Sequence, residues 1–168
     1  MTGFRSTKQL DADPAAIRRA AMNLLARREY APGELRARLV ARFGSQAPID
    51  PELERLAGEG LLSESRYIEA FVRMHRNRGH GPLRILRELE RRGVEPGRAE
   101  AGVEPGAREW YELARAWRLR RFGAGAPASA AEWQKQSRHL QQRGFSGEHI
   151  RHALRDLPDD AVAPGKYP

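Results

Sequence analysis

The side chains best suited to catalysis or metal binding lie near the end of the sequence. His149, His152 and Asp156 stand at positions i, i+3 and i+7, and this spacing places them on one face of a helix. Imidazole and carboxylate groups arranged in this way can bind a metal ion, so one hypothesis is a metal-dependent enzyme. The interpretation we favour is a solvated face opposite a buried apolar stripe. That stripe would be formed by Ile150, Ala153, Leu154 and Leu157.

The rest of the sequence offers no catalytic pattern. His75 and His80 are five residues apart beside an arginine-rich helix end, which is too wide for a pair of metal ligands. The sequence contains no H-E-x-x-H motif, no P-loop and no G-x-S-x-G motif. It also contains no cysteine, which excludes disulfides, thiolate metal sites and cysteine nucleophiles. We therefore predict a protein that is not an enzyme and that holds no metal or other cofactor.

Arginine is the most prominent chemical feature of this sequence. The 168 residues include 30 Lys and Arg against 22 Asp and Glu, which gives a net charge of +8, and only three of the basic residues are lysines. The stretch from Arg73 to Arg92 holds seven arginines and two glutamates. Within it, Arg84, Arg87 and Arg91 would share the outer face of one helix, where their guanidinium groups could bind phosphates or carboxylates.

A second basic run, from Arg115 to Arg121, contains no acidic residue and would extend this surface. A solvated face that binds nothing is the alternative interpretation. The clustering instead favours an anionic partner: a nucleic acid, an acidic protein groove, or a protein–DNA filament that offers both. The predicted partner-binding residues are Arg73, Arg76, Arg78, Arg84, Arg87, Arg91, Arg92, Arg115, Arg118 and Arg121.

Helices are the elements predicted to position these side chains. Valine and isoleucine are scarce, and no window alternates apolar and polar residues for long enough to form a strand. Apolar residues recur at helical spacing instead, and Trp110 and Trp117 are expected in the core. Helix starts are indicated by Asp13, Asp50 and Gly81 before proline, and by Ser63, Ser129 and Ser146. The expected helices span residues 14–28, 32–43, 51–61, 64–77, 82–92, 108–122, 130–142 and 147–157, with a weak additional helix between 95 and 107.

An internal repeat organises these helices. Leu-x-x-Arg precedes a turn at Leu39, Leu89 and Leu140, and a period near 50 residues is typical of stacked helical units. We therefore predict an all-α fold of three tandem three-helix, helix-turn-helix-like repeats in an elongated, curved array. The predicted boundaries are a flexible tail at 1–12, repeats at 13–62, 63–106 and 107–158, and a flexible tail at 159–168. No apolar run suits a signal peptide or a membrane span, so we expect a cytoplasmic protein without membrane contact.

The middle of the sequence resembles a known signature. Gly60-Leu61-Leu62-Ser63-Glu64-Ser65-Arg66-Tyr67, Ala70-Phe71-Val72-Arg73 and Arg78-Gly79-His80-Gly81-Pro82, followed by Arg92-Gly93-Val94, resemble the signature of the RecX family, the bacterial regulators of the RecA recombinase. The similarity extends from about residue 15 to residue 157. The first repeat departs from the pattern, because Arg42-Phe43-Gly44 stands where the family has Arg-Gly followed by an apolar residue.

The resemblance implies three tandem three-helix units that lie in the groove of a filament of RecA on single-stranded DNA. It implies a mainly inhibitory regulator that lowers ATP hydrolysis, strand exchange and repressor-cleavage coactivation. The expected partners are the RecA filament and, more weakly, single-stranded DNA, with double-stranded DNA as a further option, and the expected state is a monomer. The alternative function is a helical module that binds DNA directly, without a recombinase partner.

Overall fold

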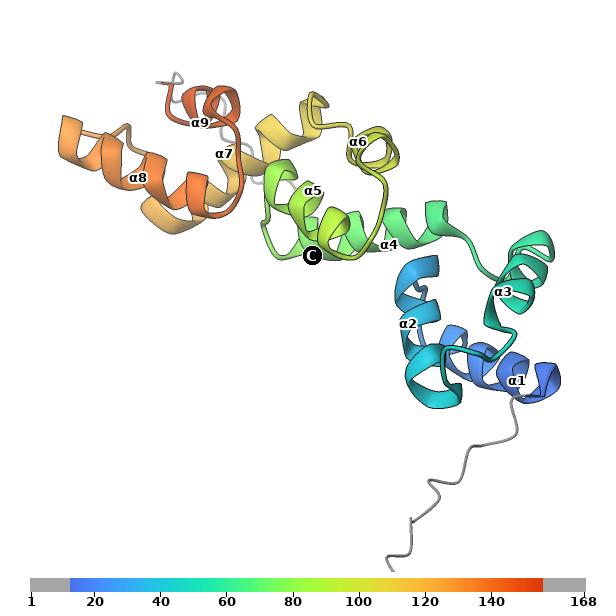
Figure 1. Cartoon of the computed structure of the whole chain (residues 1–168). Helices are drawn as coiled ribbons and strands as arrows, with labels where there is room; N and C mark the ends of the chain where they lie inside the picture. The colour runs from blue at the N-terminus through green and yellow to red at the C-terminus, as the bar shows by residue number, and fades with distance from the viewer. Residues whose placement is uncertain (1–12, 156–168) are drawn as a thin grey trace, which may run out of the picture. The chain divides into compact units, whose positions relative to one another are not determined.

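The structure is a computed structural model that describes residues 13–155. These residues form nine α-helices and no strand, which confirms the all-helical prediction (Figure 1). The predicted tails at 1–12 and 159–168, and Asp156 of the metal hypothesis, lie outside the described residues. The helices are α1 (Pro14–Leu25), α2 (Pro32–Phe43), α3 (Ile49–Gly58), α4 (Glu64–Asn77), α5 (Pro82–Arg91), α6 (Pro96–Val103), α7 (Arg108–Phe122), α8 (Ala130–Gln142) and α9 (Gly147–Ala153).

Side-chain caps begin several of these helices, as the sequence predicted. The carboxylate of Asp13 accepts from the backbone N–H of Ala15, and the hydroxyls of Ser63, Ser129 and Ser146 accept from N–H groups three residues later. Each cap satisfies a backbone donor that the helix leaves without a partner. The prediction for Asp50 was wrong, because α3 begins at Ile49.

Asp50 instead forms an ion pair between α3 and α2. Its two carboxylate oxygens accept from Nε and Nη2 of Arg36, at 2.6 and 3.0 Å. An arginine fork that binds both oxygens of a carboxylate has a defined geometry, so the pair ties α2 to the start of α3. The pKa of Asp50 is lowered because Arg36 hydrogen-bonds its charged form.

The weak third helix of the second repeat is present as α6. The carboxylate of Glu95 accepts from the N–H groups of Gly97 and Arg98, both at 3.0 Å, and so caps the start of the helix. Ala99 and Val103 are buried. Pro96-Gly97 lies inside this helix and Pro105-Gly106 follows it. Two apolar anchors and one cap are therefore enough to fix a helix of eight residues here.

The described residues divide into two compact units. The first unit consists of residues 13–74 and 86–103, and the second unit of residues 75–85 and 104–155. Helices α4 and α5 supply residues to both units. Each unit has a hydrophobic core of its own.

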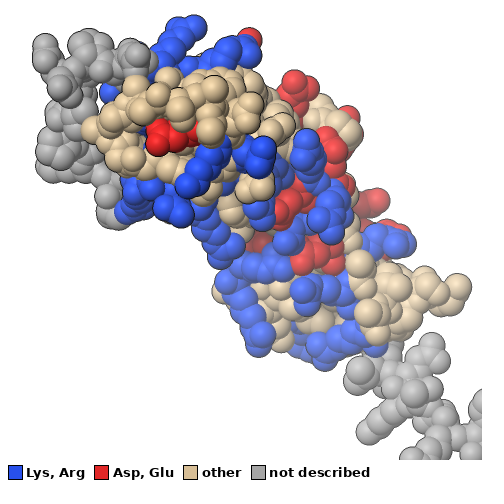
Figure 2. Space-filling model, turned by 90° about the vertical axis from the view of Figure 1, so that its left-hand side faces the viewer, with Lys and Arg blue, Asp and Glu red and all other residues tan. Residues whose placement is uncertain are grey.

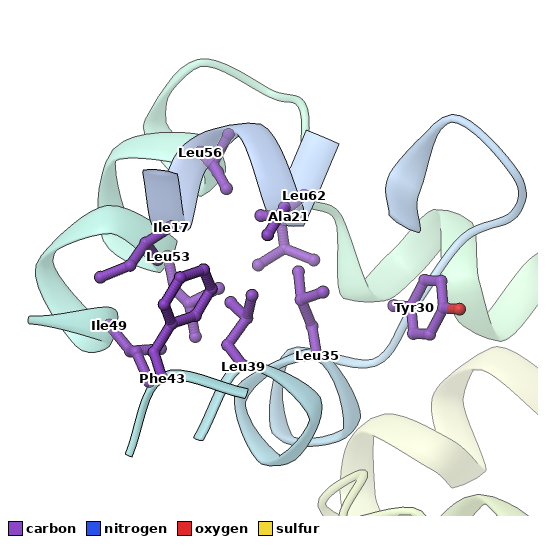
Figure 3. Close-up of a cluster of buried hydrophobic side chains, with 11 residues drawn as sticks. Ile17, Ala21, Tyr30, Leu35, Leu39, Phe43, Ile49, Leu53, Leu56 and Leu62 are labelled. Atoms are coloured by element: carbon purple, nitrogen blue, oxygen red, sulfur yellow. The ribbon is translucent and has the colours of Figure 1, made fainter. Parts of the chain in front are cut away.

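One hydrophobic cluster of the first unit is built mainly by α1, α2 and α3 (Figure 3). Helix α2 supplies Leu35, Leu39 and Phe43, four residues apart, so that the three side chains lie on the face toward α1 and α3. Figure 3 shows them against side chains of the other two helices. The other buried residues of this cluster are Ile17, Ala20, Ala21, Tyr30, Ile49, Leu53, Leu56 and Leu62.

The core of the second unit is built by α7, α8 and α9. Phe145, in the turn between α8 and α9, is fully buried with Leu140 and Ala114. Trp110 of α7 is also buried, and its indole N–H donates to the carbonyl of Glu104 at 3.1 Å. In residues 13–155, no helix combines the length and apolar character needed to cross a membrane.

Candidate binding surface

Helix α5 carries the predicted row of arginines on an exposed face. Ile85 and Leu89 are completely buried, whereas Arg84, Arg87 and Arg91 are exposed. The alternation follows from the 3.6-residue period of the helix, because positions 84, 87 and 91 lie opposite the apolar stripe. Arg87 and Arg91 form no ion pair within the described residues. Their charged groups are therefore available to an external anion.

The other predicted arginines near α5 have diverse surroundings. Arg73 and Arg78 are exposed. The guanidinium of Arg76 lies over the ring of Trp110, with 5.2 Å between its Cζ and the ring centroid. Arg92 lies over the ring of Phe71 at 5.1 Å and forms an ion pair with Glu34 at 3.6 Å. Arg76 and Arg92 therefore stabilise internal packing as well as adding positive charge.

Arg118 does not belong to an exposed row, contrary to the sequence prediction. It is 5% exposed, and its Nε donates to Oε1 of Gln136 at 2.9 Å. Its other nitrogens donate to the carbonyls of Ala124 and Gly125 in the α7–α8 connection. A guanidinium has five N–H donors, which suits it to hold a loop rich in carbonyl groups. Arg118 therefore fixes the path from α7 to α8 and is not accessible to a partner.

The remaining two predicted residues of α7 also differ from each other. Arg121 is exposed, with its guanidinium 5.5 Å from the ring centroid of Phe122. Arg115 is half-buried, and its Nε is buried without a hydrogen-bond partner. Of the second basic run, Arg121 is thus the accessible predicted residue, together with Arg120, which is exposed over the ring of Trp117.

Net charge is very unevenly divided between the two units. The second unit contains 13 Lys and Arg against five Asp and Glu, whereas the first unit contains 14 against 13. Figure 2 shows one face of the molecule, on which basic side chains gather in several groups and acidic side chains are fewer. Almost the whole excess of positive charge in residues 13–155 therefore belongs to the second unit.

Carboxylates neutralise many arginines in the first unit. The buried Glu52 accepts from Arg18 at 2.9 Å and from Arg55 at 3.2 Å, and Glu34 accepts from Arg28 at 2.6 Å. Further pairs join Arg36 to Asp50, Arg66 to Glu29, and Arg98 to Glu64. The five carboxylates of the second unit cannot balance 13 cations in the same way. A polyanionic partner is therefore expected to meet the second unit first.

Two comparisons of the sequence with known proteins agree. Family models described as "RecX, second three-helix domain" and "RecX, third three-helix domain" match residues 63–102 and 108–154. The Regulatory protein RecX of Halorhodospira halophila (strain DSM 244 / SL1) is 45% identical over 145 residues, which cover 86% of this chain and 90% of that protein. The chain belongs to the RecX family. The Regulatory protein RecX of Pseudomonas entomophila (strain L48) is 43% identical over 149 residues, which cover 87% of this chain and 96% of that protein.

Solved RecX structures share the fold. A crystal structure of RecX from Lactobacillus salivarius superposes with a TM-score of 0.74 at 21% identity, covering 86% of this chain and 96% of that one. A second crystal structure of a regulatory protein RecX gives a TM-score of 0.69 at 20% identity, covering 90% and 80%. The predicted resemblance and the tandem three-helix fold are therefore confirmed.

The histidines of this RecX chain have structural roles that the sequence did not predict. His149 is buried, whereas we had placed it on a solvated face. Its Nδ1 accepts from the N–H of Ser146 at 3.2 Å, while its own N–H donates to the Ser146 hydroxyl, which completes a capping box at the start of α9. His75 and His80, whose spacing in the sequence argues against a pair of metal ligands, have their Nδ1 atoms 2.8 Å apart. Within residues 13–155, no group of three His, Cys, Asp or Glu side chains could hold a metal ion.

The buried cap makes the stability of the protein depend on pH. Burial lowers the pKa of His149 below its ordinary value. His149 therefore takes up a proton at a higher pH in the unfolded chain than in the folded chain. The free energy of unfolding keeps its full value above the pKa that His149 has in the unfolded chain, and it falls as the pH drops through that pKa.

We expect the free energy of unfolding to fall as the pH is lowered from about 7 to 5, by at most about 1.4 kcal/mol per pH unit from one histidine. Urea denaturation followed by circular dichroism at several pH values would measure this. A His149→Asn variant should show a shallower fall, because asparagine does not titrate. An equally steep fall in this variant would show that other groups cause the effect.

Proposed function

We propose that this protein is a regulator of the RecA recombinase, which binds the filament of RecA on single-stranded DNA and mainly lowers its activity. Membership of the RecX family carries this proposal, because relatives 43 to 45% identical over most of the chain are named regulatory proteins. The lowered activities would be ATP hydrolysis, strand exchange and repressor-cleavage coactivation. The protein would act as a monomer in the cytoplasm, by binding rather than by catalysis.

The exposed face of α5 supports a role in this binding. Arg84, Arg87 and Arg91 present three guanidinium groups at successive turns of one helix. Such a row suits an anionic groove in which protein carboxylates or DNA phosphates follow one another. The other exposed arginines predicted for the partner are Arg73, Arg78, Arg92 and Arg121.

The decisive experiment measures the single-stranded-DNA-dependent ATPase of RecA from the same organism while this protein is titrated from far below stoichiometric amounts. We expect inhibition at ratios well below one molecule per RecA protomer, at concentrations where bare DNA is scarcely bound. A regulator that blocks filament growth needs few sites per filament, which explains the low ratio. Inhibition that begins only when this protein saturates the DNA would contradict the proposal.

A direct DNA-binding module is the second candidate function. The excess of positive charge in the second unit favours it. Its mark would be tight binding to bare DNA without RecA, with an affinity that falls steeply as salt is raised. Weak binding at physiological salt, together with RecA inhibition, would remove this alternative.

The α5 row can be tested with a variant in which Arg84, Arg87 and Arg91 are replaced by alanine. Alanine is a good helix former, so α5 should persist. We expect the concentration for half-maximal ATPase inhibition to rise about tenfold, because three exposed arginines each contribute on the order of 0.5 kcal/mol.

The matched control replaces Arg19, Arg27 and Arg42, three exposed arginines of the first unit without ion pairs among the described residues. Both variants lose three positive charges, but the control should inhibit almost as well as the original protein. Equal inhibition by the two variants would show that α5 does not face the partner.

A further inference from the structure

Arg143, at the end of α8, is held in place by contacts within the second unit. Its guanidinium stacks on Trp117 with 4.2 Å between Cζ and the ring centroid. Its Nη1 donates to the carbonyls of Arg78 and Gly79, at 2.9 and 3.2 Å. Its Nε donates to Nε2 of His139 at 3.3 Å. Three of its five N–H donors are therefore hydrogen-bonded and one face of its plane is stacked. These contacts hold the guanidinium in place but do not neutralise its charge.

The remaining nitrogen of Arg143 has no such partner. Among residues 13–155, Nη2 donates no hydrogen bond and the guanidinium meets no carboxylate. Its side chain is half-buried rather than fully enclosed. A fixed guanidinium with two unused N–H donors is preorganised to bind an oxyanion, because little conformational freedom is lost when the anion arrives.

Further arginines surround this group. The backbone of Arg84 packs against Gly144, the residue after Arg143. Arg120 lies over the ring of Trp117 at 5.5 Å. Burial lowers the pKa of Arg143 and the charge of Arg84 lowers it further, while burial, Arg143 and Arg121 lower the pKa of His139. The charge of Arg84 therefore acts on Arg143, the charge of Arg121 acts on His139, and Arg120 lies over the same Trp117 ring as Arg143.

We propose that Arg143, with Arg84, Arg120 and Arg121 around it, binds consecutive backbone phosphates of a single strand of nucleic acid. The name "phosphate cluster" is used below for these four residues. An anion beside Arg143 would offset its repulsion with Arg84 and would accept charge-assisted hydrogen bonds from its unused N–H donors. The proposal deepens the proposed function, on which it rests for the choice of a nucleic-acid partner. The sequence analysis assigned Arg143 only to a turn and did not select Arg120.

A polyanion fits the cluster better than a single carboxylate. The four arginines come from α5, α7 and the end of α8, and the single charge of one carboxylate could balance only one of them. A nucleic-acid strand carries one negative charge per nucleotide and can meet several guanidinium groups along its length. The second unit has eight more cations than carboxylates in its described residues, which adds long-range attraction for the same partner.

The test measures binding of the full chain to a fluorescein-labelled oligothymidylate of about 20 nucleotides, by fluorescence anisotropy at several salt concentrations, without RecA. We expect Arg143→Gln to weaken binding about tenfold or more, because a fixed guanidinium loses its charge and its fork. The Arg120→Gln and Arg121→Gln double variant should flatten the slope of log K against log salt by about 0.7 for each phosphate that the variant no longer neutralises.

The matched control is the Arg19→Gln and Arg27→Gln double variant, which loses the same charge from exposed sites of the first unit. It should bind within about twofold of the original protein, because these two arginines lie outside the phosphate cluster and an exposed charge contributes little by itself. Circular dichroism would establish that each variant is folded. If Arg143→Gln does not fold, the Arg120 and Arg121 double variant alone decides the question.

Three results would overturn the inference: unchanged affinity and salt slope in folded variants of the phosphate cluster, an equal loss in the control, or displacement of the oligonucleotide by polyglutamate as readily as by unlabelled oligothymidylate. The last result would indicate an acidic protein partner. RecA inhibition that persists alongside unchanged oligonucleotide binding would remove this inference and leave the proposed function. Oligonucleotide binding that requires Arg143, without any RecA inhibition, would remove the proposed function and leave the nucleic-acid site.

Discussion

Replacing Gly144 by alanine is expected to destabilise the second unit by about 3 kcal/mol or more. Gly144 follows α8 with φ at +90°, where an L side chain costs about 1 to 2 kcal/mol. An added Cβ would also lie 2.6 Å from the backbone nitrogen of Arg84. A backbone atom cannot move aside as a flexible side chain can, so overpacking adds typically about 1 to 3 kcal/mol. Urea denaturation of the full chain, followed by circular dichroism, would measure the loss.

Gly93 provides the matched control for this substitution. It ends α5 with φ at +84°, and nothing lies within 4 Å of the position that its Cβ would take. The two turns have the same hydrogen-bond pattern, because the N–H groups of Val94 and Phe145 each donate to the carbonyl five residues earlier. Gly93→Ala should therefore cost only the conformational part, about 1 to 2 kcal/mol. Equal losses for the two variants would show that the close approach of Arg84 contributes nothing.

Replacing Trp110 by alanine is expected to cost about 3 to 5 kcal/mol, the usual range for a large aromatic residue in a core. Trp110 is 1% exposed, and its indole N–H donates to the carbonyl of Glu104. The truncation removes the buried ring, the platform under Arg76, and the hydrogen bond at Glu104, which has a positive φ of 48°. Denaturation by urea, with circular dichroism as the signal, is the measurement.

Trp133 offers the corresponding control on α8. It is 43% exposed, and a surface substitution usually changes stability by less than about 0.5 kcal/mol. A Trp110→Phe variant adds a second comparison, because it keeps an aromatic ring but cannot donate to Glu104. Its loss should lie between those of the two alanine variants. A Trp110→Ala protein as stable as Trp133→Ala would show that Trp110 does not anchor the second unit.

Helix α5 shows how far sequence alone can predict this fold. Ile85 and Leu89 were expected on the buried face and are buried, and Arg84, Arg87 and Arg91 were correctly placed on the exposed side. Leu83, which the same pattern placed inward, is 36% exposed. Such patterns succeed because burial on a helix depends on a period that the residues themselves display. The serine caps succeeded for a similar reason, since the hydroxyl and its backbone donor are three residues apart.

Arg118 and Arg143 show where the sequence was insufficient. Both lie in basic stretches, yet one is buried against Gln136, 18 residues away, and the other meets carbonyls more than 60 residues away. Those partners come together only when the chain has folded, so charge clustering could not distinguish the two arginines. The meeting of His75 and His80 was missed because helical spacing was applied to a segment that leaves the helix, with Gly79 at a φ of +69°.

The unequal division of charge also affects the rate at which an anionic partner would associate with the protein. The field of a polyanionic partner would attract the second unit more strongly than the first, whose net charge is close to zero although Arg87 and Arg91 of α5 belong to it. Such attraction would make a larger share of collisions productive than diffusion alone would allow. Added salt shortens the reach of this field, to roughly 8 Å at physiological ionic strength, so it should slow association much more than it hastens release.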